Sequence, residues 1–443
     1  MVQFYSPPKK SLLPKKLMVT IDRLDAFGQG IAMHQNKPIF INNALPGETV
    51  EIQFTESKKQ YSKARVITYH HCSNNRQTPD CPHYGKCGGC QMQHIDLSTQ
   101  QQIKRQAFIH AMRKETGITL AESDVAIITS PPYHYRRRAR LAIMFEHNKV
   151  QIGFRAPESN HIINIQSCPV LVHELEQLIT PLRHCVEQIQ DKRALGHIEL
   201  MHVDSGTIVV LRHTKPLCEH DKQQLLTFAT QNNVSLYLHG QALVHLAGHD
   251  LHYYYVDDLE LMFSPLDFIQ VNSNINLQMI KQAIHWLELN ENDSVLDLFC
   301  GMGNFSFPIA KIAKRVIGVE GVSALVEKAT SNITVNHDRL KGEISFFVGD
   351  LELTDKTPIW YHNDINKVLL DPARLGAYQV MNIIAERKPE KIVYISCNPA
   401  TLARDSQLLL QADYQISQSM ILDMFPQTKH IESMLLFTQI GRR

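Results

Sequence analysis

The stretch Ser294-Val-Leu-Asp-Leu-Phe-Cys-Gly-Met-Gly-Asn-Phe305 decides the fold of this chain. It begins as a short apolar run, typical of a strand covered on both faces, and ends as a glycine turn. A helix is expected over residues 309–314, a second strand over 316–320 and another helix over 324–336. This alternation predicts a Rossmann-like α/β unit that binds a ligand at the carboxyl ends of its strands.

The glycine turn is compatible with two kinds of ligand. Gly301 and Gly303 let the backbone approach a ligand, and Glu320, which closes the second strand, can accept hydrogen bonds from both hydroxyls of a ribose. NAD is the alternative to S-adenosylmethionine (SAM), but the turn lacks the third glycine that a dinucleotide pyrophosphate needs. Strands that complete a seven-stranded sheet, the size typical of SAM methyltransferases, are expected at residues 344–348, 367–370, 391–396, 415–422 and 432–440.

A cysteine ends one of these strands. Residues 391–396 form a β-branched and aromatic run, Cys397 follows it, and Asn398-Pro399 breaks the strand before a helix expected over residues 400–410. A thiol at a strand end beside a helix N-terminus lies where α/β sheets place ligands and where a thiolate is stabilised. A buried structural cysteine is the alternative. Cys300, which has no partner base, is interpreted as a packing residue.

Length and composition bound the class of protein. A chain of 443 residues has room for about three domains, and its 44% hydrophobic content is ordinary for globular proteins. The N-terminus lacks the apolar core of a signal peptide, and no run approaches the ~18 apolar residues of a membrane span. Nine scattered cysteines indicate a reducing compartment with metal-binding or catalytic thiols. We therefore expect a cytoplasmic protein without a membrane partner.

Positive charge is concentrated in the first 140 residues. They hold 20 Lys and Arg against 10 Asp and Glu, which leaves 25 against 34 for the rest of the chain. A charge cluster is usually a solvated face, but several clusters in one part of the chain favour a polyanion such as nucleic acid. The clusters are Lys9, Lys10, Lys15 and Lys16; Lys58, Lys59, Lys63 and Arg65; and Arg136, Arg137, Arg138 and Arg140.

The basic front of the chain contains closely spaced strands. Five are expected, at residues 17–24, 30–34, 38–41, 49–55 and 64–69. Such strands are typical of a small OB-like barrel, which commonly binds single-stranded or looped nucleic acid. Asp25-Ala-Phe-Gly-Gln-Gly-Ile-Ala32 and Leu45-Pro-Gly-Glu-Thr-Val50 closely resemble a TRAM domain, an RNA-binding barrel appended to RNA-modifying enzymes. A barrel without a ligand is the alternative.

A cysteine motif, Cys81-Pro-His-Tyr-Gly-Lys-Cys-Gly-Gly-Cys90, follows the barrel. Its turn can bring three thiolates to one centre, which needs a fourth ligand. Cys168 is the best candidate, ahead of Cys72 and His83. By chemistry alone, such a site fits zinc or an iron–sulfur cluster equally well. The spacing differs from the Cys-x3-Cys-x2-Cys of radical-SAM enzymes, one group of which also carries a TRAM domain.

The region between the cysteine motif and the glycine turn mixes helices and strands without a metal-ligand pattern around its histidines. A long helix is expected over residues 91–117 and another over 170–190. The expected domains are a TRAM barrel over residues 12–70, a central α+β domain with the thiolate site over residues 71–265, and the methyltransferase domain over residues 266–443.

Four motifs in combination resemble the signatures of RNA 5-methyluridine methyltransferases. They are Asp297-Leu-Phe-Cys-Gly-Met-Gly-Asn-Phe305, Leu370-Asp-Pro-Ala-Arg374, Ser396-Cys-Asn-Pro-Ala-Thr401 and Asp423-Met-Phe-Pro-Gln-Thr-Lys-His-Ile-Glu-Ser433. With the barrel and the cysteine motif, almost the whole chain resembles the RlmD type, which acts on 23S ribosomal RNA. The related tRNA enzymes lack both of these features.

The resemblance implies the roles of particular residues. It implies a [4Fe–4S] cluster on Cys81, Cys87, Cys90 and Cys168. It implies that Cys397 is the nucleophile and Glu432 the base. Asp350 stands where asparagine is expected in the ribosomal enzymes. The implied SAM contacts are Gln270, Phe299, Asn304, Glu320, Asp350 and Asp371.

The chemistry of uracil accounts for this set of groups. A thiolate that attacks C6 makes C5 nucleophilic enough to take the methyl group of SAM, and a base then removes the C5 proton so that the cysteine leaves. The uridine must be flipped out of its stack to be reached. We expect a monomer that methylates C5 of a uridine in 23S ribosomal RNA. The alternatives are the same reaction on tRNA or another rRNA uridine, and a non-catalytic RNA-binding or assembly factor.

Overall fold

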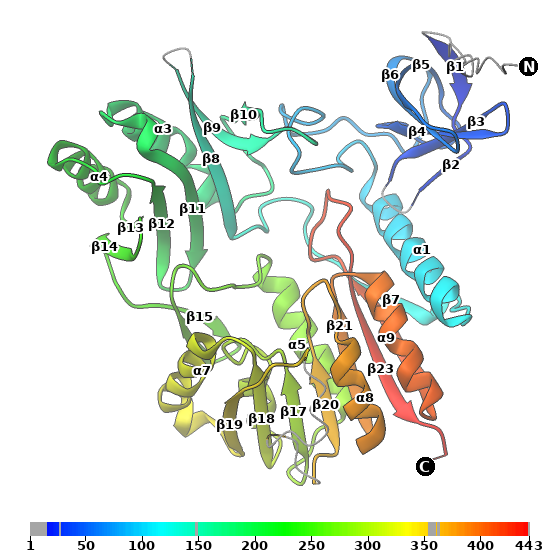
Figure 1. Ribbon diagram of the computed structural model, residues 1–443, viewed down its shortest axis with the longest axis vertical. Coiled ribbons are helices and arrows are strands. Elements are labelled where there is room, and N and C mark those ends of the chain that lie inside the picture. Colours follow the sequence, from blue (N-terminus) through cyan, green and yellow to red (C-terminus); the bar gives the residue numbers. More distant parts are fainter. Residues whose placement is uncertain (1–15, 26–27, 147–148, 353–359, 361–363, 442–443) are drawn as a thin grey trace, which may run out of the picture.

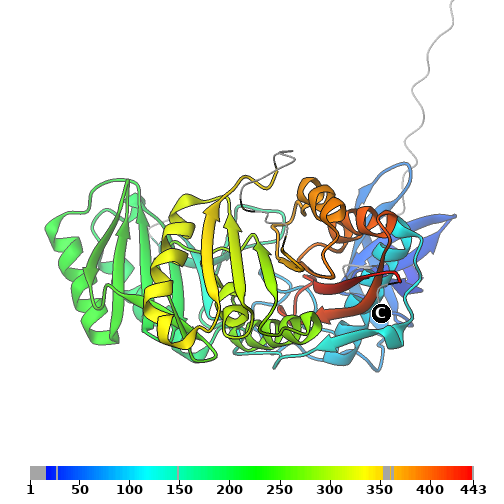
Figure 2. The ribbon, with the colours of Figure 1, turned by 90° about the horizontal axis from the view of Figure 1, so that it is seen from below.

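Three large β-sheets organise the molecule. The computed structural model describes residues 16–25, 28–146, 149–352, 360 and 364–441. A six-stranded N-terminal sheet and a seven-stranded central sheet lie on opposite sides, and an eight-stranded sheet lies between them (Figures 1 and 2). Among the described residues, no helix is both long and apolar enough to cross a membrane.

The N-terminal sheet has one strand more than expected. The strand predicted over residues 17–24 is two strands, because the Ile21 amide hydrogen-bonds to Glu48 O and the Asp22 amide to Ile31 O. Alternate residues such as Val50 and Ile52 point into a buried core. The sheet order is β1-β5-β6-β4-β3-β2. The strands are β1 (Leu17–Thr20), β2 (Arg23–Leu24), β3 (Gly30–His34), β4 (Lys37–Asn42), β5 (Thr49–Ser57) and β6 (Ser62–His71).

The first long helix, α1 (Leu97–Thr116), begins six residues later than expected. Asp96 caps it by accepting a hydrogen bond from the Thr99 amide, and Gly117 ends it with a left-handed φ of 76°. The residues before Asp96 remain a loop because the Gln91 and Met92 amides both donate to Gln427 O.

The central sheet has the order β10-β9-β8-β11-β12-β13-β14. The helix expected over residues 170–190 is two helices, since the chain turns between them at Gln177 and Leu178. The strands are β8 (Arg138–Glu146), β9 (Lys149–Arg155), β10 (Ile162–Asn164), β11 (Leu195–Val203), β12 (Gly206–His213), β13 (Val234–His239) and β14 (Leu243–Ala247). The helices are η1 (Glu122–Asp124), α2 (His173–Glu176), α3 (Ile179–Gln188), η2 (Lys192–Ala194) and α4 (Glu219–Asn232).

The eight-stranded sheet has the order β19-β18-β17-β20-β21-β23-β22-β7. Seven of its strands were expected; the eighth, β7 (Val125–Ile128), comes from the segment assigned to the central domain and pairs in parallel with β22. The other strands are β17 (Ser294–Leu298), β18 (Arg315–Glu320), β19 (Glu343–Val348), β20 (Lys367–Leu370), β21 (Lys391–Ser396), β22 (Tyr414–Leu422) and β23 (Glu432–Gln439). The helices are α5 (Ser273–Leu287), α6 (Ser306–Ala310), α7 (Ser323–Asn336), η3 (His337–Arg339), α8 (Tyr378–Arg387) and α9 (Pro399–Gln411).

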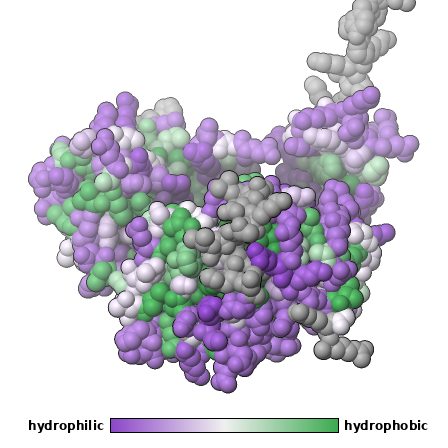
Figure 3. Space-filling view, turned by 60° about the horizontal axis from the view of Figure 1, so that its bottom comes forward, coloured by the Kyte–Doolittle hydropathy of each residue, from purple (hydrophilic) through white to green (hydrophobic). Residues whose placement is uncertain are grey.

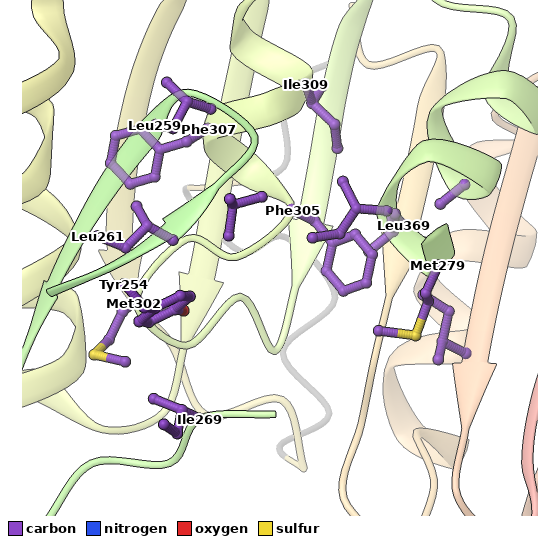
Figure 4. Close-up of a cluster of buried hydrophobic side chains, with 14 of the residues drawn as sticks. Tyr254, Leu259, Leu261, Ile269, Met279, Met302, Phe305, Phe307, Ile309 and Leu369 are labelled. Carbon is purple, nitrogen blue, oxygen red and sulfur yellow. The ribbon is translucent and has the colours of Figure 1, made fainter. Parts of the chain in front are cut away.

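A continuous apolar core joins the central sheet to the eight-stranded sheet. It includes side chains of both sheets, of α5 and of the hairpin β15 (His252–Val256) and β16 (Leu259–Phe263). Figure 4 shows Leu259 and Leu261 of this hairpin beside Phe307 of α6, and Phe305 beside Leu369 of β20. Each such side chain contributes roughly 1.5–3 kcal/mol by leaving water. On the face in Figure 3, hydrophilic residues surround scattered apolar patches.

Candidate active site

The carboxyl ends of four neighbouring parallel strands carry four of the predicted site residues. Phe299 follows β17, Glu320 closes β18, Asp350 lies just beyond β19, and Asp371 follows β20. The strands pair in register, so these residues lie along one edge of the sheet. This edge is where open α/β sheets bind ligands.

The glycine turn at this edge leaves room in front of its backbone. Phe299, Gly301 and Gly303 have φ values of 61°, 55° and 94°. A Cβ atom added at Gly301 would meet nothing within 4 Å, whereas one at Gly303 would lie 2.5 Å from the Phe307 ring. The Gly301 amide donates to Glu320 Oε2 at 3.2 Å, which holds the carboxylate beside the open space. An open cradle next to a fixed carboxylate suits a ribose of SAM.

The remaining predicted cofactor residues are held in different ways. Asn304 exchanges two amide hydrogen bonds with Asn276 of α5, at 2.9 and 3.0 Å. Gln270 is fixed through its backbone, because Arg137 Nε donates to Gln270 O at 2.8 Å. Asp350 is exposed, and its Oδ1 accepts a hydrogen bond from the Glu352 amide at 2.9 Å.

Strand register brings Cys397 and Glu432 together. In the antiparallel pair of β21 and β23, Ser396 lies opposite Ser433, and Ser433 Oγ donates to Ser396 O at 3.1 Å. This is the last pair of the ladder; Cys397 follows Ser396, and Glu432 precedes Ser433. The charge of Glu432 acts on the Cys397 thiol, which places the two side chains close together. A thiol and a carboxyl group thus stand side by side at the strand ends.

Burial and mutual repulsion perturb these groups. Burial, followed by the charges of Glu432 and Asp371, raises the pKa of the Cys397 thiol to about 11. Burial raises the pKa of Asp371 to about 7. The pKa of Glu432 is raised well above its usual range, first by burial and then by Asp371. Perturbed titratable groups that cluster at a ligand-binding edge are typical of active sites.

Arg374 is a site residue to which the sequence reasoning gave no role, although it lies in the quoted motif Leu370-Asp-Pro-Ala-Arg374. Its side chain is exposed, and its positive charge lowers the pKa of Cys397, opposing the effect of burial. Its backbone is fixed because Asn398 Nδ2 and Thr401 Oγ1 both donate to Arg374 O, at 3.1 and 3.3 Å. Helix α9 therefore holds the loop that presents this guanidinium near the thiol.

Asp297 is a second residue to which no role was given. It lies in β17, is 1% exposed, and accepts a hydrogen bond from Ser306 Oγ through Oδ2. Its Oδ1 is buried without a partner. Burial, together with the charge of Asp371, raises the pKa of Asp297 to about 7, against the effect of the Ser306 bond.

The four predicted cluster cysteines lie close together. Burial raises the pKa of Cys90 to about 11 and that of Cys168 to about 12, and the charges of the neighbouring thiolates add to both shifts. For Cys168 these neighbours are Cys90, Cys81 and Cys87. Of the two substitutes, His83 contacts this set through its backbone, which hydrogen-bonds to the Cys81 sulfur and opposes the effect of burial on the pKa of that thiol.

The spacing of the thiols is wider than that of a single tetrahedral ion. Four sulfur atoms at 2.3 Å from one zinc ion stand about 3.8 Å apart. In the part of the chain that the structure describes, one set of three or more potential ligands lies within 4.8 Å, and it is His134, His173 and Glu176. The two imidazole rings of that set stack with their centroids 3.8 Å apart, and Glu176 Oε1 accepts a hydrogen bond from the Cys168 backbone amide.

All four arginines of the third basic cluster have structural partners; Arg136 Nε donates to Arg138 O, and Arg140 pairs with Glu199 at 3.4 Å. Arg137 is buried against the backbone of the loop that carries Gln270, and Arg138 pairs with Glu199 at 2.9 Å. A buried guanidinium cannot contact a phosphate, so Arg137 does not line the expected polyanion track. Lys9, Lys10 and Lys15 of the first cluster lie outside the described residues.

Comparisons with known proteins identify the two main parts of the chain. A model of the tRNA (uracil-5-)-methyltransferase family matches residues 99–346 and 350–440, and a TRAM domain model matches residues 12–67. The predicted TRAM domain is thereby confirmed. The solved structure of Pyrococcus abyssi tRNA (uracil-54, C5)-methyltransferase in complex with S-adenosyl-L-homocysteine shares the fold, with a TM-score of 0.74 and 23% identity over 95% of this chain and 100% of that one.

Curated relatives match the chain from end to end. A Photorhabdus laumondii protein named 23S rRNA (uracil(1939)-C(5))-methyltransferase RlmD is 48% identical over 99% of this chain and 100% of its own length. A protein of the same name from Aliivibrio fischeri is 45% identical over the same shares. With such relatives over its full length, the protein belongs to the tRNA (uracil-5-)-methyltransferase family, as its sequence motifs predicted.

Proposed function

We propose that this protein is a SAM-dependent methyltransferase that converts a uridine of 23S ribosomal RNA to 5-methyluridine through a covalent adduct on Cys397. The observation that carries the proposal is the closeness of Cys397 and Glu432 at the end of the β21–β23 ladder, on the sheet edge that also carries the glycine turn after β17. The full-length relatives named as 23S rRNA uracil-C5 methyltransferases support the choice of RNA.

The first step is attack by the Cys397 thiolate on C6 of the uracil. The free thiol has a pKa of about 11, so its proton must pass to solvent as the substrate binds. Arg374 favours the thiolate, whereas an ionised Asp371 opposes it. The C6–S bond converts the ring to an enolate whose electron pair reaches C5.

Bound SAM would supply the electrophilic methyl group: C5 takes it, the methyl–sulfur bond breaks, and S-adenosylhomocysteine is the leaving group. We assign the binding of SAM to Gln270, Phe299, Asn304, Glu320, Asp350 and Asp371, along the edge described above. The adduct then carries both the new methyl group and the C5 proton. Glu432 accepts this proton, the electron pair returns to the C5–C6 bond, and the Cys397 sulfur is expelled.

The N-terminal part of the chain binds the RNA around the target uridine. The uridine has to leave its stack to reach Cys397, which directly follows β21. The TRAM barrel carries exposed basic side chains, among them Lys58 and Lys63, which share the exposed Glu56 carboxylate and suit the phosphates of the flanking nucleotides. We further propose that the protein acts as a cytoplasmic monomer.

We also propose a [4Fe–4S] cluster on Cys81, Cys87, Cys90 and Cys168. Four neighbouring thiols form the donor set of such a cluster, and each would bind a different iron, which fits their wide spacing. Methyl transfer needs no electron, so the bound cluster would serve to hold together the loop of the first three cysteines and the segment of Cys168.

Two RNA experiments test the function. RNA that contains 5-fluorouridine cannot lose a proton from C5, so the protein is expected to form a stable adduct with it that migrates as one band under denaturing conditions. Cys397→Ala is expected to form no adduct, and an adduct with this variant would refute the mechanism. Glu432→Gln is expected to transfer the methyl group and then remain attached to ordinary RNA.

Mapping of modified nucleotides distinguishes the candidate substrates. Cells that lack the protein are expected to lose one 5-methyluridine from 23S ribosomal RNA and none from tRNA. Loss from tRNA instead would favour the alternative substrate. Unchanged RNA, together with no binding of SAM to the purified protein, would favour a non-catalytic RNA-binding factor.

A further inference from the structure

The loop of residues 423–431, which joins β22 to β23, leads directly into Glu432 and is held from inside the protein by helix α1. Lys104 Nζ lies 2.7 Å from Asp423 Oδ1 and donates to Phe425 O at 3.0 Å. The side chains of this ion pair are 2% and 1% exposed. A buried ion pair costs desolvation that its attraction barely offsets, so its presence indicates a need for a defined geometry.

A second pair of contacts lies one turn earlier on α1. Gln100 Nε2 donates to Gln427 Oε1, and the backbone N–H of Gln427 donates to Gln100 Oε1, both at 3.0 Å. Gln427 has a φ of 69°, a conformation that a glutamine adopts only when its surroundings hold it there. We call Gln100, Lys104, Asp423 and Gln427 the α1 clamp.

The other side of the loop is also fixed. Tyr135 Oη donates to Pro426 O at 2.9 Å, and the Gln91 and Met92 amides donate to Gln427 O. The nucleophile depends on different contacts, since Cys397 is placed by β21 and by the start of α9. The clamp therefore bears on the position of Glu432 more directly than on that of Cys397.

We propose that Gln100 and Lys104 are positioning residues for the second half of the reaction: through the α1 clamp they place the Glu432 carboxylate where it reaches the C5 proton of the methylated adduct. This inference rests on the proposed function. Loosening the clamp leaves attack and methyl transfer almost intact and slows proton removal. A catalytic group misplaced by about 1 Å costs about a hundredfold in rate.

A single-turnover experiment with two labels separates the two steps. The RNA carries tritium at C5 of the target uridine, and SAM carries a labelled methyl group. With Lys104→Met, methyl transfer is expected to stay within about threefold of the unsubstituted rate, while tritium release slows by about tenfold or more. Methylated RNA attached to the protein then accumulates, which a general loss of structure would not produce.

A second variant and a matched control complete the test. Gln427→Gly removes the hydrogen bond from Gln100 Nε2 to the Gln427 side chain while a glycine accepts the positive φ, so it reports on the clamp should Lys104→Met not fold. Lys367→Met breaks an equally buried ion pair, 2.6 Å from Asp293 at the opposite ends of β17 and β20, and is expected to slow neither step.

Three outcomes overturn the inference. Equal slowing of methyl transfer and tritium release in the clamp variants would make the clamp merely structural. Unchanged kinetics would show that Glu432 does not depend on it. Absence of methyl transfer by the unsubstituted protein would refute the proposed function itself and this inference with it.

Discussion

The Cys397 thiol is expected to react slowly with iodoacetamide in the absence of RNA. Its pKa is raised to about 11, against about 8.5 for an ordinary cysteine. At pH 7.5 this lowers the thiolate fraction about three-hundredfold. A thiolate of higher pKa is intrinsically more nucleophilic, which raises its rate constant for alkylation roughly tenfold. The net expectation is alkylation about thirtyfold slower than that of an unperturbed thiol.

The assay follows the Cys397 peptide by mass spectrometry between pH 7 and pH 10. The rate is expected to rise about tenfold per pH unit without a plateau, because the thiol remains mostly protonated throughout. Asp371→Asn removes a negative charge that raises the pKa of Cys397, so this variant reacts faster at a given pH. Arg374→Ala removes a positive charge that lowers this pKa and reacts more slowly.

A plateau below pH 9 in the unsubstituted protein would refute this reasoning. It would mean that the thiol is already ionised before RNA binds, and that proton loss is not coupled to substrate binding. Exposed Cys218 supplies the internal reference in the same digest.

Three further predictions test single sites. The folded-state pKa of Asp297, about 7, exceeds its unfolded value of about 3.9, so the native chain loses stability as the pH rises from 4 to 7. Asp297→Asn lacks this loss. Between pH 5 and pH 8 the free energy of unfolding of the variant should rise by about 2–3 kcal/mol relative to that of the native chain, measured by denaturant unfolding. Gly301→Ala should weaken SAM binding about tenfold or more in calorimetric titration, because its Cβ fills the open cradle, whereas Gly117→Ala, with a similar φ and equally open space at the end of α1, should leave binding unchanged. Gly88→Ala should lower the iron and sulfide content of the purified protein, because the added Cβ would lie 2.9 Å from Arg155 O and displace the cysteine turn; full iron content would contradict this.

Features that depend on residues close together in the sequence could be predicted from the sequence alone. The glycine turn after residue 298, the strand that ends at Cys397 and the cysteine motif around Gly88 each lie within about a dozen residues. Their conformations follow from local sterics and hydrophobic periodicity, so the strands and turns appear near their expected positions. Combined, these motifs were specific enough to predict the family.

Tertiary structure decided which of these features meet. Cys397 and Glu432 are 35 residues apart in the chain and become neighbours through the antiparallel register of β21 and β23. Gln100 and Gln427 are separated by 327 residues, and β7 joins β22 from the other half of the chain. Such long-range pairs leave no pattern in the local sequence. Each residue of a pair is an ordinary polar or β-branched residue, and only folding of the whole chain brings the two residues together.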